Sequence, residues 1–194
     1  MLGKLRKRYE QFMGPIGRRL GSLGFSPNTL TITSTVLSCL AGFFFYAREP
    51  LLGAITIVVT GVIDMLDGAV ARATNRVTRF GGVLDHVLDR YAEFAIIVGM
   101  LLGGHLNPLW AIYVIFGMVM ASYVRAKAES IGGLKSCSVG IMERQEKLIL
   151  LVIGSILVLW FEEALNITAI IVGTLSHVTA VQRLMYTYKL ANGA

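Results

Sequence analysis

Long runs of apolar side chains constrain the fold of this chain more than any other feature. A helix that crosses a bilayer needs about 20 residues, and the apolar runs extend to roughly this length at six places. The six predicted spans are 28–46, 51–72, 81–104, 107–129, 144–161 and 165–188. With 55% hydrophobic and only 15% charged residues, the composition is too apolar for a soluble domain. The sequence therefore predicts a single all-α domain, an integral membrane bundle of six transmembrane helices.

The positions of the lysine and arginine residues predict the orientation of these helices. Lys and Arg near the ends of spans stay on the cytoplasmic side. An even number of spans places both termini and the loops 73–80 and 130–143 on one side, and that side holds every Lys and Arg except Arg48. We therefore expect a multi-pass protein of the cell membrane with both termini in the cytoplasm. This bias, together with attraction to anionic lipid headgroups, accounts for the net charge of +6 without nucleic acid as a partner.

The first 25 residues have a different pattern from the six-helix core, which we place at 26–190. Apolar side chains recur there at helical spacing, and basic residues fill the other faces. The apolar positions are Leu2, Leu5, Tyr9, Phe12, Ile16, Leu20 and Leu23. Such a pattern predicts an amphipathic helix that lies in the cytoplasmic interface, and it lacks the compact apolar run and cleavage site of a secretory signal. Cys39 falls in a span and Cys137 in an inner loop, so no disulfide is expected.

Four aspartates lie where a bilayer would otherwise exclude charge. Asp64 and Asp67 end the span 51–72, and Asp85 and Asp89 begin the span 81–104. Spacings of three and four residues put each pair on one face of its helix, and the short turn between the spans lets the pairs face each other. An ionised carboxylate in a membrane is costly, so we expect divalent cations to be needed to neutralise four of them. Oxygen ligands favour Mg²⁺, Mn²⁺ or Ca²⁺ over zinc.

The residues around the aspartates favour phosphoryl chemistry. Arg72, Arg76 and Arg79 add positive charge beside the carboxylates, and a guanidinium suits bidentate contact with phosphate. Two metal ions about 3.5–4 Å apart can hold the attacking and leaving oxygens of a displacement at phosphorus, while a less committed carboxylate takes the proton. A divalent metal-ion transporter is the alternative from another class. The wholly apolar stretch 51–57 argues against it, because permeation needs polar residues along the path.

Residues 64–89 also follow a longer pattern, D-x2-D-G-x2-A-R-x8-G-x3-D-x3-D. This pattern resembles the signature of the CDP-alcohol phosphatidyltransferases, integral membrane enzymes that move a phosphatidyl-type group from a CDP-linked lipid to an alcohol and release CMP. The resemblance covers nearly the whole chain, from about Pro15 to Lys189. It implies a six-span core, a homodimer and two Mg²⁺ or Mn²⁺ ions in each active site.

The same resemblance implies roles for individual residues. Asp64, Asp67 and Asp85 correspond to the principal metal ligands, and Asp89 corresponds to the metal-associated catalytic base. The stretch "SPNTLT" at the first span is similar to the family's Pro-Asn step, which borders the nucleotide. The residues implied to bind the CDP-lipid are Pro27, Asn28, Thr29, Leu30, Gly68, Arg72 and Thr78. Glu93 extends the row of Asp85 and Asp89 by one turn, and we expect it to pair with a cation on another span.

Basic residues at the inner ends of the last three spans point to the acceptor. The segments "SYVRAKAES", "MERQEKL" and "AVQRL" resemble the phosphatidylinositol phosphate synthase branch, whose acceptor is inositol 1-phosphate. The candidate phosphate-binding residues are Arg125, Lys147, Arg183, Arg144 and Lys127. The first two depart from that branch, which usually has Lys at the position of Arg125 and Arg at the position of Lys147.

Two questions about the substrates stay open at this point. Any one of these five cations could instead be an ordinary anchor to lipid headgroups, and a sister enzyme could use glycerol 3-phosphate or another alcohol. CDP-diacylglycerol and CDP-archaeol are both possible donors.

Overall fold

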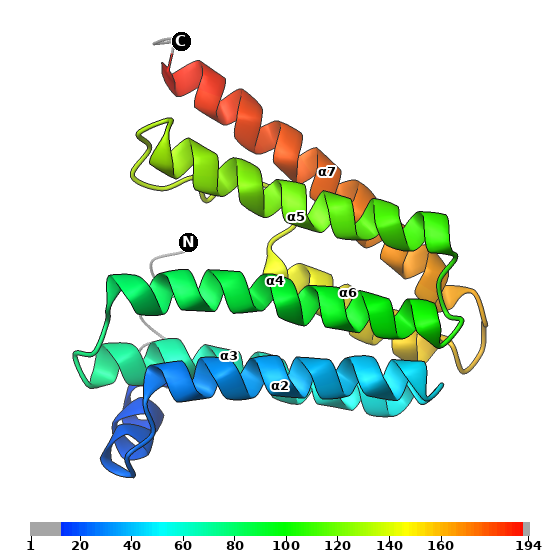
Figure 1. Ribbon diagram of the computed structural model, residues 1–194, viewed down its shortest axis with the longest axis horizontal. Coiled ribbons are helices and arrows are strands. Elements are labelled where there is room, and N and C mark those ends of the chain that lie inside the picture. Colours follow the sequence, from blue (N-terminus) through cyan, green and yellow to red (C-terminus); the bar gives the residue numbers. More distant parts are fainter. Residues whose placement is uncertain (1–12, 192–194) are drawn as a thin grey trace.

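The computed structural model describes residues 13–191, and all of its regular elements over this range are helices (Figure 1). A short helix at residues 13–22, here called the N-terminal helix, precedes six longer ones. These are α2 (Pro27–Tyr46), α3 (Pro50–Ala73), α4 (Arg79–Leu102), α5 (Pro108–Ser130), α6 (Arg144–Leu157) and α7 (Ala164–Ala191). The predicted all-α class is confirmed, and the six helices fall close to the six predicted spans.

Local sequence signals explain where the helices begin. The Ser26 side chain accepts a hydrogen bond from the Thr29 backbone at the start of α2, and Pro27 follows it at the first helical position. Asn107 caps α5 in the same way, with Pro108 after it. Glu143 and Glu146 form a reciprocal capping box at the start of α6.

Four of the helices, α2, α3, α5 and α7, are long and apolar enough to cross a membrane. α4 carries several charged residues, and α6 has only 14 residues, which at 1.5 Å per residue span about 21 Å of a hydrocarbon core about 30 Å thick. α6 ends at Leu157, not at the predicted residue 161, because the backbone tightens into turns. Leu159 and Trp160 donate to the carbonyls of Ile156 and Leu157, three residues back. Membrane-helix character is thus confirmed at four places, and the count of six spans stays a prediction.

The helices pack in two connected groups (Figure 1). α2 packs against both α3 and α4, α5 packs against α7, and α6 contacts α3 and α7. Their shared core contains large buried side chains from all six of these helices. The largest include Phe45, Ile57, Ile97, Met100, Leu151, Leu165 and Val172. Many large apolar side chains, such as Val36 and Ile55, are exposed on the outside, as expected of a bundle surrounded by lipid.

One end of the bundle gathers most of the polar segments (Figure 1). The N-terminal helix, the turn between α3 and α4, the 131–143 loop and the end of α7 all lie at this end, which we call the basic end. The connections around Arg48, residues 103–107 and residues 158–163 lie at the other. α6 begins part-way along α4 (Figure 1).

The N-terminal helix packs on the end of α3 through glycines. A Cβ atom on Gly17 would lie 2.6 Å from the Ala69 carbonyl oxygen, so only glycine permits this approach. Of the predicted apolar stripe, Ile16 and Leu23 are exposed, and positions 2–12 lie outside the described residues. The placement of the N-terminal helix in the membrane interface stays a prediction.

Candidate active site

Three of the four aspartates converge between α3 and α4. Asp64, Asp67 and Asp85 each offer one carboxylate oxygen, and these oxygens all lie within 4.8 Å of one another. Two oxygens bound to one Mg²⁺ at 2.0–2.1 Å lie at most about 4.2 Å apart, so small side-chain movements would let the three share an ion. The donor set is all oxygen and suits a hard divalent cation. The residues therefore fit the predicted metal.

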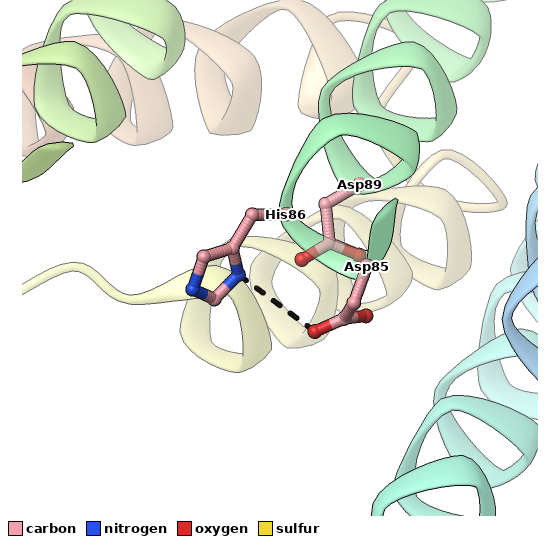
Figure 2. A group of neighbouring side chains, drawn as sticks. All are labelled: Asp85, His86 and Asp89. Carbon is pink, nitrogen blue, oxygen red and sulfur yellow. Dashed lines mark ion pairs between the residues drawn. The ribbon is translucent and has the colours of Figure 1, made fainter. Parts of the chain in front are cut away.

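Asp89 lies one helical turn beyond Asp85 and is more deeply buried, at 8% exposure. It forms a second group of candidate metal ligands with Asp85 and His86 (Figure 2). The His86 Nδ1 atom is 3.7 Å from Asp85 Oδ2, although the imidazole is largely exposed. Side chains of adjacent helical residues leave the backbone in different directions, but the exposed His86 side chain is long enough for its ring to reach back toward Asp85.

Arg144 occupies a position that the sequence did not predict. Its guanidinium pairs with Asp64 Oδ1, and the same nitrogen lies 2.7 Å from Asp89 Oδ1. This cation, the first residue of α6, was predicted at the acceptor phosphate, and it also bridges carboxylates of α3 and α4. The expectation that divalent ions alone neutralise the aspartates is therefore incomplete.

A cavity of about 290 Å³, here called the donor cavity, opens on one side of the aspartates. Its walls come from the start of α2, the end of α3 and the start of α4. It is lined by Pro27, Asn28, Thr31, Asp67, Gly68, Ala71, Arg72, Arg76, Val77, Thr78, Gly81, Gly82 and Asp85. Five of the seven residues predicted to bind CDP-lipid thus share one cavity. The other two do not line it, because Thr29 bonds back to Ser26 and Leu30 turns into the protein.

Thr31 is a site residue that sequence reasoning missed. Its hydroxyl donates a 2.6 Å hydrogen bond to Asp67 Oδ2, and it is only 4% exposed. Such a bond fixes the orientation of a candidate metal ligand. The sequence signal that could have identified Thr31 was its position one helical turn after Pro27, on the helix face that carries the Pro-Asn step.

A larger cavity of about 740 Å³, here called the acceptor cavity, opens on the other side. Its polar lining includes Asp64, His86, Asp89, Arg90, Ser122, Arg125, Glu129, Glu143, Arg144, Gln145, Lys147 and Arg183. Four of the five predicted acceptor residues are among them. Lys127 is exposed and does not line the cavity, and its ammonium lies over the Tyr123 ring, 5.5 Å from the centroid.

The cations of the acceptor cavity are held in different ways. Arg125 donates to Glu129 Oε1 at 3.1 Å. Arg183, which is 4% exposed, donates to the backbone carbonyls of Val139 at 2.8 Å and Ala121 at 2.7 Å. These contacts fix the Arg183 guanidinium to α5 and to the 131–143 loop without neutralising its charge.

A buried ionic group links α4, α5 and α6 at the wall of the acceptor cavity. Glu93 accepts from Lys147 Nζ at 3.2 Å through Oε1 and pairs with Arg90 at 2.7 Å through Oε2. Arg90 also donates to Ser122 Oγ at 2.6 Å. The expected pairing of Glu93 with a cation on another helix is observed. Arg90 and Ser122 were missed, although a charged residue within a predicted span, such as Arg90, is itself a signal of a functional site.

Comparison with known proteins identifies the family. The family model for CDP-alcohol phosphatidyltransferases matches residues 25–182. The chain is 38% identical to an archaetidylinositol phosphate synthase of Pyrococcus horikoshii, covering 94% of each chain. It is 32% identical to a phosphatidylinositol phosphate synthase of Mycobacteroides abscessus, covering 97% of this chain and 89% of that protein.

Two crystal structures of a Mycobacterium tuberculosis phosphatidylinositol phosphate synthase share the fold. The one with CDP-DAG bound has a TM-score of 0.81 at 29% identity and covers 92% of this chain and 94% of that one. The one in complex with manganese and citrate has a TM-score of 0.80 at 30% identity and covers 91% of this chain and 88% of that one. From the matched family model and these relatives, the chain belongs to the CDP-alcohol phosphatidyltransferase family.

Proposed function

We propose that this protein transfers a phosphatidyl or archaetidyl group from a CDP-linked lipid to inositol 1-phosphate and releases CMP. One observation carries the proposal: two cavities meet at a single group of carboxylates. Asp67 and Asp85 line the donor cavity, while Asp64 and Asp89 line the acceptor cavity. Five of the seven residues that the resemblance implies bind the CDP-lipid line the donor cavity. Relatives named for inositol phosphate products match over nearly the whole chain.

The charge of the acceptor cavity supports a phosphorylated acceptor. Arg125 is paired with Glu129, and Arg144 is paired with two aspartates. Arg90 and Lys147 share Glu93 within the buried group, and Arg90 also lies 3.8 Å from Asp89. Arg183 is held by carbonyls, so these three cations do not each have a carboxylate of their own. A phosphate monoester carries about −1.5 to −2 charges at pH 7, so it would pair with these cations, whereas an uncharged alcohol would not.

The proposed mechanism assigns each side chain a task. Gly68, Arg72 and Thr78 hold the CDP part of the donor, with Pro27 and Asn28 beside it. Asp64, Asp67 and Asp85, with Asp89 at their edge, would hold two divalent ions, which supply positive charge to the pyrophosphate when bound.

Asp89 then takes the proton from an acceptor hydroxyl. The acceptor phosphate is held by Arg125, Lys147 and Arg183. The new bond forms between the hydroxyl oxygen and the phosphorus that carries the lipid. The bond from that phosphorus to the CMP phosphate breaks, and CMP leaves.

We also infer that the chain crosses the membrane six times. The acidic side chains of α4 do not exclude it from the bilayer, because Asp89 and Glu93 are buried and paired with cations of other helices. Both termini would then lie in the cytoplasm with the basic end. We further propose that the protein is a homodimer, which light scattering of the purified protein would test. The bound ions are Mg²⁺ or Mn²⁺.

An acceptor panel tests the proposed function. The purified protein is reconstituted with CDP-diacylglycerol or CDP-archaeol and Mg²⁺ or Mn²⁺, and CMP release is measured with inositol 1-phosphate, glycerol 3-phosphate, inositol or serine. We expect CMP and a lipid-linked inositol phosphate only with the first acceptor, and no turnover after chelation of the metal. Turnover with glycerol 3-phosphate but not with inositol 1-phosphate would assign the chain to the sister activity.

The transporter alternative gains no support from the packing. Ile57, Ile96 and Ile97 are fully buried beyond the carboxylates on the way to the other end of the bundle. Side chains of this kind close an ion path, so we expect no manganese uptake by liposomes that contain the protein.

A further inference from the structure

Glu93 lies at the centre of the buried ionic group, and each of its carboxylate oxygens has a different cationic partner. Oε1 holds Lys147 of α6, and Oε2 holds Arg90 of its own helix. The Glu93 residue is 4% exposed and Lys147 is 2% exposed. Glu93 does not line the acceptor cavity itself, whereas both of its partners do. It can therefore reach a ligand of that cavity only through them.

The energetics of buried ions argue that this group is more than a structural link. A buried ion pair is seldom more stabilising than apolar side chains of similar volume, because both charges lose their hydration. Here two cations share Glu93, and the other carboxylate near Arg90, that of Asp89, is 3.8 Å away and is paired with Arg144. A buried group with more positive than negative charge is expected where a bound anion supplies the missing negative charge. Lys147 has three N–H donors, and Glu93 takes one of them.

The placement of Glu93 on α4 couples it to the carboxylates. Asp85, Asp89 and Glu93 follow one another at intervals of four residues, about 6 Å along the helix. The row thus runs from the metal-binding carboxylates, through the candidate base, to the residue that holds Lys147. One rigid helix fixes the separation between the proton acceptor and the cation that faces the acceptor's phosphate.

We propose that Glu93 is a positioning residue that orients Lys147 toward the phosphate of the acceptor. This inference rests on the proposed function. A lysine side chain without such a partner samples many rotamers, and fixing it on binding costs conformational entropy. Glu93 fixes the Lys147 ammonium before the acceptor arrives, so it contributes to acceptor binding without touching the acceptor.

Electrostatics alone predicts the opposite effect, which makes the inference testable. Removing the negative charge of Glu93 makes the cavity more positive, and Coulomb attraction alone would then tighten the binding of an anion. Loss of orientation would weaken it. The direction of the change in KM for the acceptor therefore separates the two effects.

The experiment compares Glu93→Gln with the wild type in the reconstituted assay. We expect the KM for inositol 1-phosphate to rise about tenfold or more, with kcat changed less than about threefold and with the KM for the CDP-lipid unchanged. Glu163→Gln, which removes an exposed carboxylate at the far end of the bundle, should leave all three values unchanged. An acceptor KM that stays constant or falls in Glu93→Gln would overturn the proposal.

A double-mutant cycle tests whether Glu93 acts through Lys147. In a Lys147→Met background, Glu93→Gln should change the acceptor KM less than about twofold, because the residue that it orients is gone. If the two effects multiply in full, Glu93 does not act through Lys147, and the proposal fails. Should Glu93→Gln prove too unstable to purify, Glu93→Asp keeps the charge but shortens the reach. A wild-type acceptor KM in that variant would also refute the proposal.

A binding measurement separates this inference from the proposed function. If the wild type released no CMP with inositol 1-phosphate, the proposed acceptor would be wrong. Calorimetry with inorganic phosphate would still test Glu93, since it needs no turnover. We expect phosphate to bind at least about tenfold more weakly to Glu93→Gln than to the wild type, and equal affinity would overturn the role of Glu93.

Discussion

At the scale of single residues, the balance of charge around the aspartates favours the binding of cations there. Asp64, Asp67, Asp85 and Asp89 would carry four negative charges if all were ionised, and Arg144 offsets one of them through its pairs with Asp64 and Asp89. Arg90 lies 3.8 Å from Asp89 but is already engaged with Glu93. Most of the negative charge is therefore left for divalent ions, and Arg144 reduces the repulsion between the carboxylates before the ions bind.

The proposed role of Asp89 as base gives the first prediction. Asp89→Asn keeps the size of the side chain and its contact with Arg144 but removes the proton acceptor. We expect turnover to fall by about 10²–10⁴-fold, with CDP-lipid affinity unchanged and at least one bound Mn²⁺ retained. CMP release gives the rate, and calorimetry gives both affinities. Full activity in this variant would refute the assignment.

The hydrogen bond from Thr31 to Asp67 gives the second prediction. Thr31→Val keeps the shape and removes the donor, which leaves Asp67 free to rotate. Loss of such a bond to a metal ligand typically lowers metal affinity or activity by about 10–100-fold, and we expect this range for Mn²⁺ binding measured by paramagnetic resonance.

Thr56→Val is the matched control for that measurement. Thr56 is also a buried helical threonine, but it bonds only to the Leu52 carbonyl of its own helix. An equal loss of Mn²⁺ affinity in both variants would show that the effect is not specific to Asp67.

At the scale of helices, glycines decide how closely α2 approaches α4. A Cβ atom on Gly99 would overlap the backbone carbonyl of Gly42, and one on Gly42 would meet the carbonyl of Ala95. This close contact sets the distance between the start of α2, which carries Thr31, and the carboxylates of α4. Small residues at helix contacts are the usual means by which membrane helices pack tightly.

The third prediction follows from this contact. Gly99→Ala should destabilise the protein by about 1–3 kcal/mol, because backbone atoms must move to admit the methyl group. Gly61→Ala is the control, since nothing lies within 4 Å of a Cβ atom there, and alanine is the better helix former. Thermal unfolding in detergent should show a lower midpoint for Gly99→Ala and an equal or higher one for Gly61→Ala. Equal midpoints for Gly99→Ala and the wild type would contradict the packing argument.

At the scale of the whole molecule, the distribution of charge predicts the orientation in the membrane. The site lies toward the basic end, where in this orientation CMP and a water-soluble acceptor phosphate would exchange with the cytoplasm, while the apolar outer faces of the helices would contact lipid. The donor's chains could then stay in the bilayer while its head group enters the donor cavity. This arrangement requires both termini on the cytoplasmic side.

Reporter fusions test this fourth prediction. Green fluorescent protein at the C-terminus should fluoresce, because it folds in the cytoplasm, and alkaline phosphatase inserted after Gly104 should be active, because it folds outside. A C-terminal alkaline phosphatase fusion serves as the control and should be inactive. The reverse pattern would place the site on the outer side and would contradict the proposed orientation.

The sequence alone predicted the helices, most of their ends and the convergence of Asp64, Asp67 and Asp85. These features depend on local information: apolar runs and a short turn that brings neighbouring helices together. The family pattern also lies within one continuous stretch, so it could be read without a structure. The shortened α6 was the exception, because the turn at its end lies in an apolar stretch with no breaking residue.

Only the tertiary structure decided which distant side chains meet. Thr31 and Asp67 are 36 positions apart, and Glu93 and Lys147 are 54 positions apart. The rotation of each helix about its axis, set by packing, turned Arg144 onto the carboxylates and left Lys127 outside the acceptor cavity. No local pattern encodes that rotation, because it depends on the side chains of every neighbouring helix at once. The sequence therefore determined which charges are present in the membrane, and the packing determined which of them neutralise one another.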